Sequence, residues 1–363
     1  MNIVVLQDYL RSGGTERQSL LLSEAFAAAG HRVALLTFRP GGALDAVPPG
    51  VTRRALQSPD LGLDWFAPGL VRTVRSFAPD VVLCMGRMAN CHGGGLQANL
   101  PHTAVVATLR TGKSLPWLFR RTLHRVRHIA ANSCEARANA LVRHGLDASR
   151  VSVIYNSLVF SAPEERRRDN ALRSLHGART GTTVLLCVAM FRPEKNQREL
   201  IEIVSRLPAD LDWQLWLAGD GPARAACERL AAVRTLAGRV KFLGWQRNPA
   251  GLYAAANIAV HASASEALSN FLIEAQAHGL PSVACEAQGI SECCVPGDTG
   301  FVVARGDRDA FCAHIVTLAR EGDEYRQARS ARAQAFARTT FDRERQASAY
   351  LELFSKLITP SLP

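Results

Sequence analysis

Two glutamates, Glu266 and Glu274, flank a stretch that changes from loop to helix. Small polar residues such as Ser269 and Asn270 favour helix N-caps, and Gly279 is typical of a helix end. The unpaired amides of the first helical turn would bind a diphosphate without a metal ion. The two carboxylates would lie roughly 10 Å apart, and each accepts hydroxyl protons. These residues therefore predict a sugar-nucleotide site, with one carboxylate on sugar hydroxyls and the other on ribose hydroxyls.

The two glutamates are separated by seven residues and are followed by Ala275, Ala277, Gly279 and Pro281. This pattern resembles the signature of retaining glycosyltransferase family 4, also called glycosyl transferases group 1. The resemblance implies an α/β GT-B fold, in which two Rossmann-like doubly wound domains face each other across a cleft. It also implies a metal-independent hexosyltransferase that retains the anomeric configuration. An isolated pair of glutamates is more often part of a solvated surface helix, and the flanking motif is what favours the site.

Two cations follow the first strand of the second half of the chain, at Arg192 and Lys195. Arginine offers a bidentate fork and lysine a point charge, and the family resembled has such a pair at this place. We expect both to bind the leaving diphosphate, with a merely charged loop as the alternative. Together with Glu266, which would position the sugar rather than act as a covalent nucleophile, they are the predicted catalytic residues. The donor-binding residues expected around the start of the helix are Leu268, Ser269, Asn270 and Glu274.

Glycine turns supply further candidate contacts. Gly13 and Gly14 open a helix, where paired glycines let a ligand approach the backbone amides. They do not form a Gly-x-Gly-x-x-Gly pattern, so dinucleotide binding is not expected. The resemblance implies that they face the donor phosphates or the acceptor, and a plain turn is the alternative. Gly219 belongs to a segment that resembles the family element shaping the pocket wall. Trp245 lies where the family contacts the nucleobase, and it would either stack on the base or belong to the core.

Some positions depart from the family pattern. Gln288 replaces the first glycine of a Gly-Gly-x-x-Glu loop beside the sugar, and Ala267 replaces a glycine after the first glutamate. Neither change removes a charged group, so we still expect an active enzyme. Arg110 stands where many members carry a histidine, and we expect Arg110 and Asn156 on the acceptor or sugar side. The nearby histidines, which are more often structural, are His92 and His102.

Short apolar runs alternate with helical stretches, which predicts parallel sheets covered by helices on both faces. The alternation stops in the polar residues 156–168 and restarts at 183. We predict an acceptor-binding Rossmann-like domain over 1–160 and a nucleotide-sugar-binding one over 161–340. The resemblance implies that a C-terminal helix over 341–363 packs back on the first domain. The predicted strands are 3–6, 33–37, 81–85, 103–109, 129–132, 151–155, 183–189, 213–218, 240–243, 258–260, 282–284 and 301–303.

The chain has 363 residues, 47% of them hydrophobic, which is enough for two separate cores. Its formal charge is +11, and residues 1–160 hold 18 Lys and Arg against 9 Asp and Glu. The densest basic part begins at Lys113 and ends at His128, with Trp117 and other apolar residues between the cations. That mixture suits a helix on an anionic membrane surface, at about 1 kcal/mol per basic residue. An ordinary solvated helix is the alternative, and no nucleic-acid partner is expected.

The nine cysteines are scattered and form no Cys-x-x-Cys pair, so we expect reduced thiols and neither a metal site nor disulfides. With no signal peptide and no apolar span of roughly 20 residues recognised, the expected location is the cytoplasm, peripheral on the inner face of the cell membrane. We expect no cofactor, a UDP-sugar rather than a GDP-sugar donor, and a cell-envelope glycan or lipid-linked acceptor, as in polysaccharide or lipopolysaccharide synthesis. The alternatives are a GT-B-like UDP-sugar epimerase and a non-catalytic nucleotide-binding module at the membrane surface.

Overall fold

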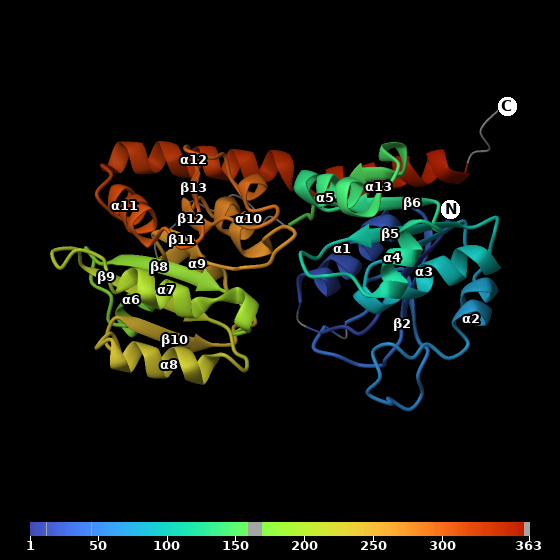
Figure 1. Cartoon of the computed structure of the whole chain (residues 1–363), viewed down its shortest axis with the longest axis horizontal. Helices are drawn as coiled ribbons and strands as arrows, with labels where there is room; N and C mark the ends of the chain where they lie inside the picture. The colour runs from blue at the N-terminus through green and yellow to red at the C-terminus, as the bar shows by residue number, and fades with distance from the viewer. Residues whose placement is uncertain (12, 45, 159–168, 359–363) are drawn as a thin grey trace. The chain divides into compact units, whose positions relative to one another are not determined.

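The computed structural model describes residues 1–11, 13–44, 46–158 and 169–358. The chain forms two compact units (Figure 1). Unit 1 combines Met1–Ser157 with Phe341–Pro363, and unit 2 is the continuous segment Leu158–Thr340. The first predicted domain ran to residue 160, whereas unit 1 ends its first segment at Ser157. Residues 159–168, most of the predicted boundary, lie outside the described residues.

The described residues of unit 1 form a seven-stranded parallel sheet in the order β3-β2-β1-β4-β5-β6-β7. The central strands are buried at every position of β4 and β5, as expected where helices cover both faces. The strands are β1 (Asn2–Gln7), β2 (Arg32–Thr37), β3 (Val51–Ala55), β4 (Val81–Cys84), β5 (Ala104–Leu109), β6 (His128–Ala131) and β7 (Val151–Val153). The helices are α1 (Gly14–Ala28), α2 (Leu70–Ser76), α3 (Arg87–Asn99), α4 (Trp117–Leu123), α5 (Cys134–His144) and α13 (Arg343–Ile358).

Helix α13 completes a core that begins at the first strand. Its Tyr350 and Phe354 rings lie 6.3 and 5.6 Å from the ring of Phe26 in α1, and all three side chains are fully buried. Gln346 donates to the side chain of Gln18 and to a backbone carbonyl of the segment after β7. The sheet of unit 1 is therefore covered on one face by helices from both ends of the chain.

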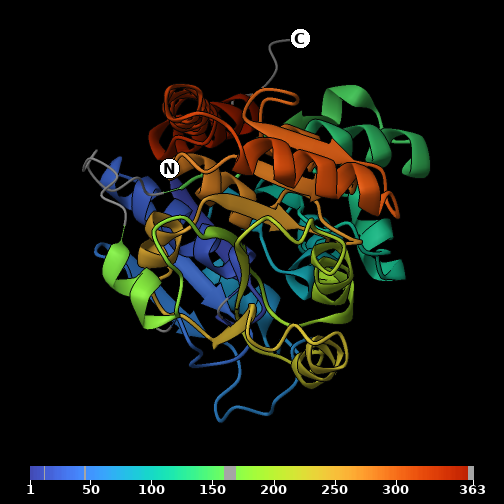
Figure 2. The ribbon, with the colours of Figure 1, turned by 90° about the vertical axis from the view of Figure 1, so that its left-hand side faces the viewer.

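The described residues of unit 2 form a six-stranded parallel sheet in the order β10-β9-β8-β11-β12-β13, with helices on both faces (Figure 2). The strands are β8 (Thr183–Val188), β9 (Trp213–Ala218), β10 (Val240–Gly244), β11 (Ile258–His261), β12 (Ser282–Cys285) and β13 (Gly300–Val303). The α-helices are α6 (Asn170–Leu175), α7 (Gln197–Val204), α8 (Arg224–Val233), α9 (Ala250–Ala255), α10 (Asn270–Ala277), α11 (Arg308–Ala319) and α12 (Asp323–Thr340). Short 3-10 helices are η1 (Ala148–Arg150) in unit 1, and η2 (Pro193–Lys195) and η3 (Ser291–Cys293) in unit 2.

The predicted α/β class with two doubly wound sheets is confirmed, and one strand was missed. Strand β3 lies at the edge of the sheet and pairs only with β2 among the described strands. Its sequence, Val-Thr-Arg-Arg-Ala, has only Val51 buried. Charged residues are usual on edge strands because they discourage further pairing, and they also hide the apolar signal on which the prediction depended.

Candidate functional site

The order of strands in unit 2 reverses between β8 and β11, which pair in parallel. Connections leave these two strands in opposite directions, and such a switch point is where open α/β sheets bind ligands. The loop after β8 carries Lys195, and the loop after β11 carries Glu266. Backbone and side chain tie the two loops together, because the Ala264 N–H and the Ser263 hydroxyl both donate to the Glu194 carbonyl, at 2.8 and 3.0 Å.

Glu266 accepts two hydrogen bonds on one oxygen. Lys195 Nζ lies 2.5 Å from Glu266 Oε1, and His261 Nε2 lies 2.9 Å from the same atom. The glutamate is only 9% exposed and the histidine 1%. Burial alone raises the pKa of Glu266, but the His261 hydrogen bond and the Lys195 charge outweigh it and lower the pKa to about 2. Glu266 is therefore an ionised carboxylate at neutral pH and can only accept hydrogen bonds.

The two predicted cations lie in different environments. Arg192 precedes η2, is exposed, and forms no ion pair within the described part of the chain. Lys195 ends η2, and its side chain is 26% exposed while it binds Glu266. The structure thus brings Lys195, but not Arg192, into contact with the predicted sugar-binding carboxylate.

Helix α10 begins at Asn270, where the sequence predicted a helix start. Ser269 is its N-cap, and its hydroxyl accepts from the Leu272 N–H at 3.4 Å. Leu268, just before the cap, is buried. The loop at Gly289 packs closely here: Gly289 has φ +72°, and a Cβ there would lie 2.0 Å from the Ala267 carbonyl oxygen, so only glycine fits.

Glu274 lies on α10 and is half-buried. The hydroxyl of Tyr253, from α9, donates to Glu274 Oε2 at 2.6 Å. The Tyr253 ring stacks on His278, with centroids 4.8 Å apart and an angle of 8° between the planes. The second carboxylate thus accepts a hydrogen bond from a tyrosine hydroxyl.

Gly219 and Trp245 lie at the ends of neighbouring strands. Gly219 has φ +140°, and a Cβ there would lie 2.0 Å from the Ala189 carbonyl oxygen, so the turn after β9 packs directly on the turn after β8. Its N–H donates to the Gly244 carbonyl at 2.7 Å, next to Trp245. Trp245 is 54% exposed and is therefore not part of the core.

The remaining predicted residues lie in unit 1. Gly13 is the N-cap of α1 and Gly14 its first residue. Arg110 donates to Asn156 Oδ1 at 2.5 Å, so the structure brings this predicted pair together, and burial lowers the pKa of Arg110. Among the two histidines considered nearby, His92 bonds to the Trp65 carbonyl at 3.0 Å and His102 is exposed on a turn.

Three side chains that the sequence did not identify lie at these sites: His261, Tyr253 and Asp8. Asp8 follows β1 at the switch point of unit 1, and its oxygens accept the Met88 and Ala89 N–H groups at 2.9 and 2.6 Å. Burial is the main cause that raises the Asp8 pKa to about 6. A carboxylate directly after the first strand was the available signal for Asp8. No sequence spacing pointed to His261 or Tyr253.

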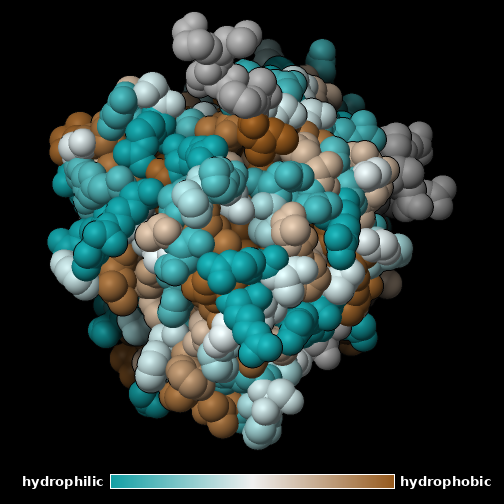
Figure 3. Space-filling model, turned by 90° about the vertical axis from the view of Figure 1, so that its right-hand side faces the viewer, coloured by the Kyte–Doolittle hydropathy of each residue, from teal (hydrophilic) through white to brown (hydrophobic). Residues whose placement is uncertain are grey.

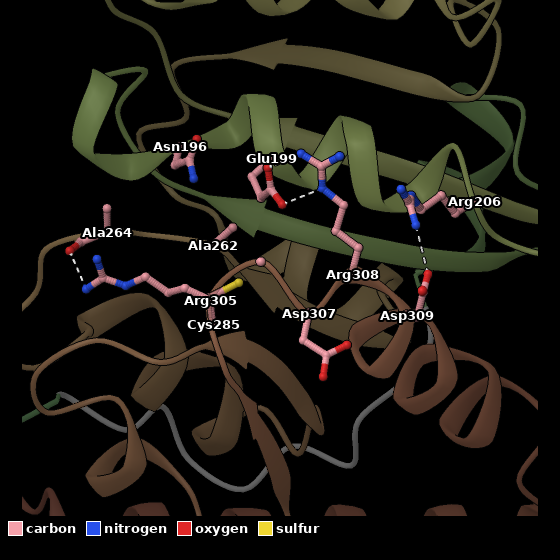
Figure 4. A pocket seen from close by; sticks show the side chains of 11 residues that line it. Asn196, Glu199, Arg206, Ala262, Ala264, Cys285, Arg305, Asp307, Arg308 and Asp309 are labelled. Atoms are coloured by element: carbon pink, nitrogen blue, oxygen red, sulfur yellow. Dashed lines mark hydrogen bonds and ion pairs between the residues drawn. The ribbon is translucent and has the colours of Figure 1, made fainter.

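A cavity of about 400 Å³ lies between the starts of α7 and α11, and Ala262 and Ala264 of the loop after β11 line it (Figure 4). Arg308 forms a bidentate ion pair with Glu199, in which Nε and Nη2 lie 2.7 and 2.8 Å from the two carboxylate oxygens. Arg305 donates to the Ala264 and Glu286 carbonyls, at 2.8 and 2.9 Å. None of the predicted site residues lines this cavity within the described residues. Its walls support the loop that leads to Glu266.

Within the described residues, no group of three or more His, Cys, Asp and Glu side chains is arranged to hold a metal ion. Likewise, none of the helices in the described ranges combines the length and apolarity needed to cross a membrane.

Comparison with known proteins gives two family matches. Residues 182–321 match the model described as glycosyl transferases group 1, and residues 12–158 match the model of glycosyltransferase family 4. The lipopolysaccharide core biosynthesis glycosyltransferase LpsE of Rhizobium meliloti (strain 1021) is 32% identical over 172 residues, which are 47% of this chain and 49% of LpsE. N-acetyl-alpha-D-glucosaminyl L-malate synthase of Bacillus anthracis is 27% identical over 209 residues, 52% of this chain and 55% of that protein. The chain thus spans about half the length of these curated relatives.

Solved structures agree over nearly the whole chain. HepE of Anabaena, crystallised with UDP, has a TM-score of 0.81 and 22% identity, covering 98% of this chain and 100% of HepE. WaaG, a glycosyltransferase involved in lipopolysaccharide biosynthesis, has a TM-score of 0.74 and 17% identity, covering 99% of this chain and 100% of WaaG. At these identities the likeness establishes the fold alone, and that fold is GT-B, as the sequence predicted.

Proposed function

The chain belongs to glycosyltransferase family 4 of the glycosyl transferases group 1, and from this membership we propose that it transfers a sugar from a nucleotide-diphosphate donor to a hydroxyl group. The observation that carries the proposal is the ionised Glu266 beside Lys195, in the loop that leads into the N-terminus of α10 at the switch point of unit 2. We propose UDP-sugar as the donor class and retention as the stereochemical outcome, without a metal ion.

The geometry supports a separate protein group for each part of the donor: sugar, diphosphate, ribose and base. An ionised carboxylate accepts hydroxyl protons, so Glu266 binds the sugar. The amides at the start of α10 and the cations Arg192 and Lys195 bind the diphosphate and stabilise the charge that grows on it as it leaves. Glu274 binds the ribose, and Trp245 stacks on the base. The acceptor hydroxyl attacks from the face that the leaving group vacates, and its proton passes to the donor phosphate oxygen.

The relatives support the choice of donor and acceptor. HepE was crystallised with UDP, with UDP and glucose, and with UDP-glucose. LpsE and LpsD of Rhizobium meliloti are named for lipopolysaccharide core biosynthesis, and WaaG for lipopolysaccharide biosynthesis. We accordingly propose a cell-envelope glycan or a lipid-linked glycan as the acceptor, with Arg110 and Asn156 of unit 1 on the acceptor side.

Helix α4 supports a peripheral position on an anionic membrane, at the inner face of the cell membrane. It buries Phe119 and Leu123 but leaves Trp117 61% and Leu118 50% exposed beside Arg120. The Arg121 guanidinium lies 5.4 Å from the Trp117 ring centroid. Tryptophan favours the membrane interface, and arginine is attracted to anionic headgroups. Hydrophobic and hydrophilic side chains are interspersed over the face in Figure 3.

Sedimentation with anionic vesicles tests this membrane position. The double variant Trp117→Ala with Leu118→Ala should bind the vesicles more weakly than wild type. Equal binding of the variant and wild type would contradict the proposal.

A panel of UDP- and GDP-sugars tests the catalytic proposal. Purified protein is incubated with each donor, with and without EDTA, and nucleotide release is followed together with the anomeric configuration of the product by NMR. We expect one UDP-sugar to be turned over selectively, with retention and without loss of rate in EDTA. Release of a free epimerised sugar would instead establish an epimerase, and nucleotide binding without turnover of any donor would establish a binding module.

A further inference from the structure

We propose that His261 is a positioning residue that orients the Glu266 carboxylate, so that the protein holds Oε1 and presents Oε2 to a hydroxyl of the donor sugar. The proposal rests on the proposed function, because it concerns the carboxylate that binds the sugar there. His261 itself touches no substrate in this arrangement. It acts through Glu266.

Both protein donors bind the same carboxylate oxygen. His261 Nε2 and Lys195 Nζ lie 2.9 and 2.5 Å from Glu266 Oε1. Glu266 Oε2 receives no hydrogen bond from the described residues. A carboxylate anchored at one oxygen cannot rotate without breaking those bonds, so its second oxygen keeps a fixed direction. A fixed acceptor selects a hydroxyl by position, which is how a binding group gains specificity.

The two donors differ in mobility. Lys195 is 26% exposed on a flexible side chain, and a bound diphosphate would compete for its ammonium group. His261 is 1% exposed at the end of β11, and its ring lies 5.7 Å from that of Phe271 in α10. The histidine therefore keeps Glu266 in place when Lys195 turns toward the diphosphate.

The hydrogen bonds define the tautomer of the histidine. Nε2 must donate, because an ionised carboxylate only accepts. Nδ1 is buried and has no hydrogen-bond partner within the described residues, so a proton there would be unsatisfied. The buried thiols near this group, Cys187 and Cys293, have pKa values raised by burial and stay neutral. The structure thus assigns the proton that faces Glu266 to Nε2.

Nitrogen-15 NMR of the histidine rings tests this assignment without any turnover. In the full chain at pH 7.5, with signals assigned through His261→Gln, we expect one protonated nitrogen, Nε2, and one bare nitrogen, Nδ1. Glu266→Ala should shift the Nε2 resonance, because its acceptor is lost. A ring whose only proton is on Nδ1 would overturn the proposal, because Nε2 could not then donate to Glu266.

Kinetics test the consequence. His261→Leu should lower kcat/KM for the donor by about 10- to 100-fold, because a misplaced carboxylate binds the sugar poorly. Its affinity for UDP, which lacks the sugar, should stay within about twofold. His261→Gln keeps an N–H donor and should recover most of the loss. His314→Leu removes a half-buried histidine of the same unit that stacks on Phe301, 4.1 Å away, and serves as the matched control.

The outcomes separate the two proposals. Equal donor kinetics in His261→Leu and wild type, or an equal loss in the Leu and Gln variants, would contradict a positioning role. A parallel loss of UDP affinity would show general damage to unit 2 and would also contradict it. If the wild-type chain turned over no donor, the proposed function would fail, and the ring tautomer would still decide whether His261 orients Glu266.

Discussion

In unit 1 and in unit 2 the strand order reverses beside a carboxylate, Asp8 after β1 and Glu266 after β11. Asp8 is held by two backbone N–H groups, and Glu266 by the side chains of Lys195 and His261. Burial prevails at Asp8 and raises its pKa to about 6. At Glu266 the partners prevail and lower the pKa to about 2.

The two switch points therefore carry carboxylates of opposite chemistry, one after the first strand of unit 1 and the other after the fourth strand of unit 2. Topology decides where a side chain can meet a ligand, and the partners of that side chain decide its charge. Unit 2 provides a permanent anion next to a cation, which suits a donor with hydroxyls and a diphosphate. Unit 1 provides a carboxylate that changes protonation near neutral pH.

Removing the positive charge of Lys195 should have the largest effect on activity. Lys195→Met deletes the charge that we propose stabilises the leaving diphosphate, and we expect kcat for the donor to fall about 10²- to 10³-fold. Steady-state nucleotide release measures it. Lys241→Met, on β10 of the same unit, is the control and should keep its rate. If Lys195→Met were as active as this control, the ion pair between Lys195 and Glu266 would have no role in catalysis, and the contrast drawn between the two units would fail.

The stability of unit 2 should depend on the ionised Glu266. Its pKa lies below the ordinary 4.5, so the stabilisation is present above about pH 4.5 and is lost as pH falls toward 2. Glu266→Gln should therefore lower the free energy of unfolding by about 2–3 kcal/mol at pH 7, and by less at pH 3. Urea unfolding followed by fluorescence of the buried Trp213 and Trp216 in β9 reports on this unit. A difference independent of pH would contradict the ion pair.

The stability contributed by Asp8 should depend on pH in the opposite direction. Its pKa is raised from 3.8, so its stabilisation is present below about pH 3.8 and is lost as pH rises through 6. Relative to wild type, the free energy of unfolding of Asp8→Asn should rise by about 1–2 kcal/mol between pH 4 and pH 7.5. This energy already allows for partial screening by solvent. Hydrogen exchange of α3, whose first amides Asp8 accepts, measures the change. A change in the same direction as Glu266→Gln would remove the contrast between the units.

The smallest effect concerns the second carboxylate of unit 2. Tyr253→Phe removes one neutral hydrogen bond to Glu274, and we expect about fivefold weaker UDP binding, or about 1 kcal/mol. Titration calorimetry measures it. Tyr325→Phe, at a 71% exposed tyrosine of α12, is the matched control. Unchanged affinity in Tyr253→Phe would mean that Glu274 either needs no such support or does not bind the ribose.

The fold was largely predictable because apolar strands alternating with helices specify doubly wound sheets. The start of α10 was also predictable, since Ser269 caps the helix locally. Contacts across the fold were not. His261 looks like any residue at the end of an apolar strand until the loop after β11 turns Glu266 back onto it. Tyr253 meets Glu274 only when α9 and α10 pack, and β3 was hidden by the charges of an edge strand.

The return of α13 to unit 1 has a consequence for synthesis on the ribosome. The core around Phe26 contains Tyr350 and Phe354, so it cannot close until the whole of unit 2 has been translated. Domains usually fold as they emerge, N-terminal first. Here the continuous unit 2 can fold first, while the nascent unit 1 keeps an apolar face uncovered and open to chaperones. Stopping translation before Phe341 should leave a folded unit 2 attached to an incomplete unit 1.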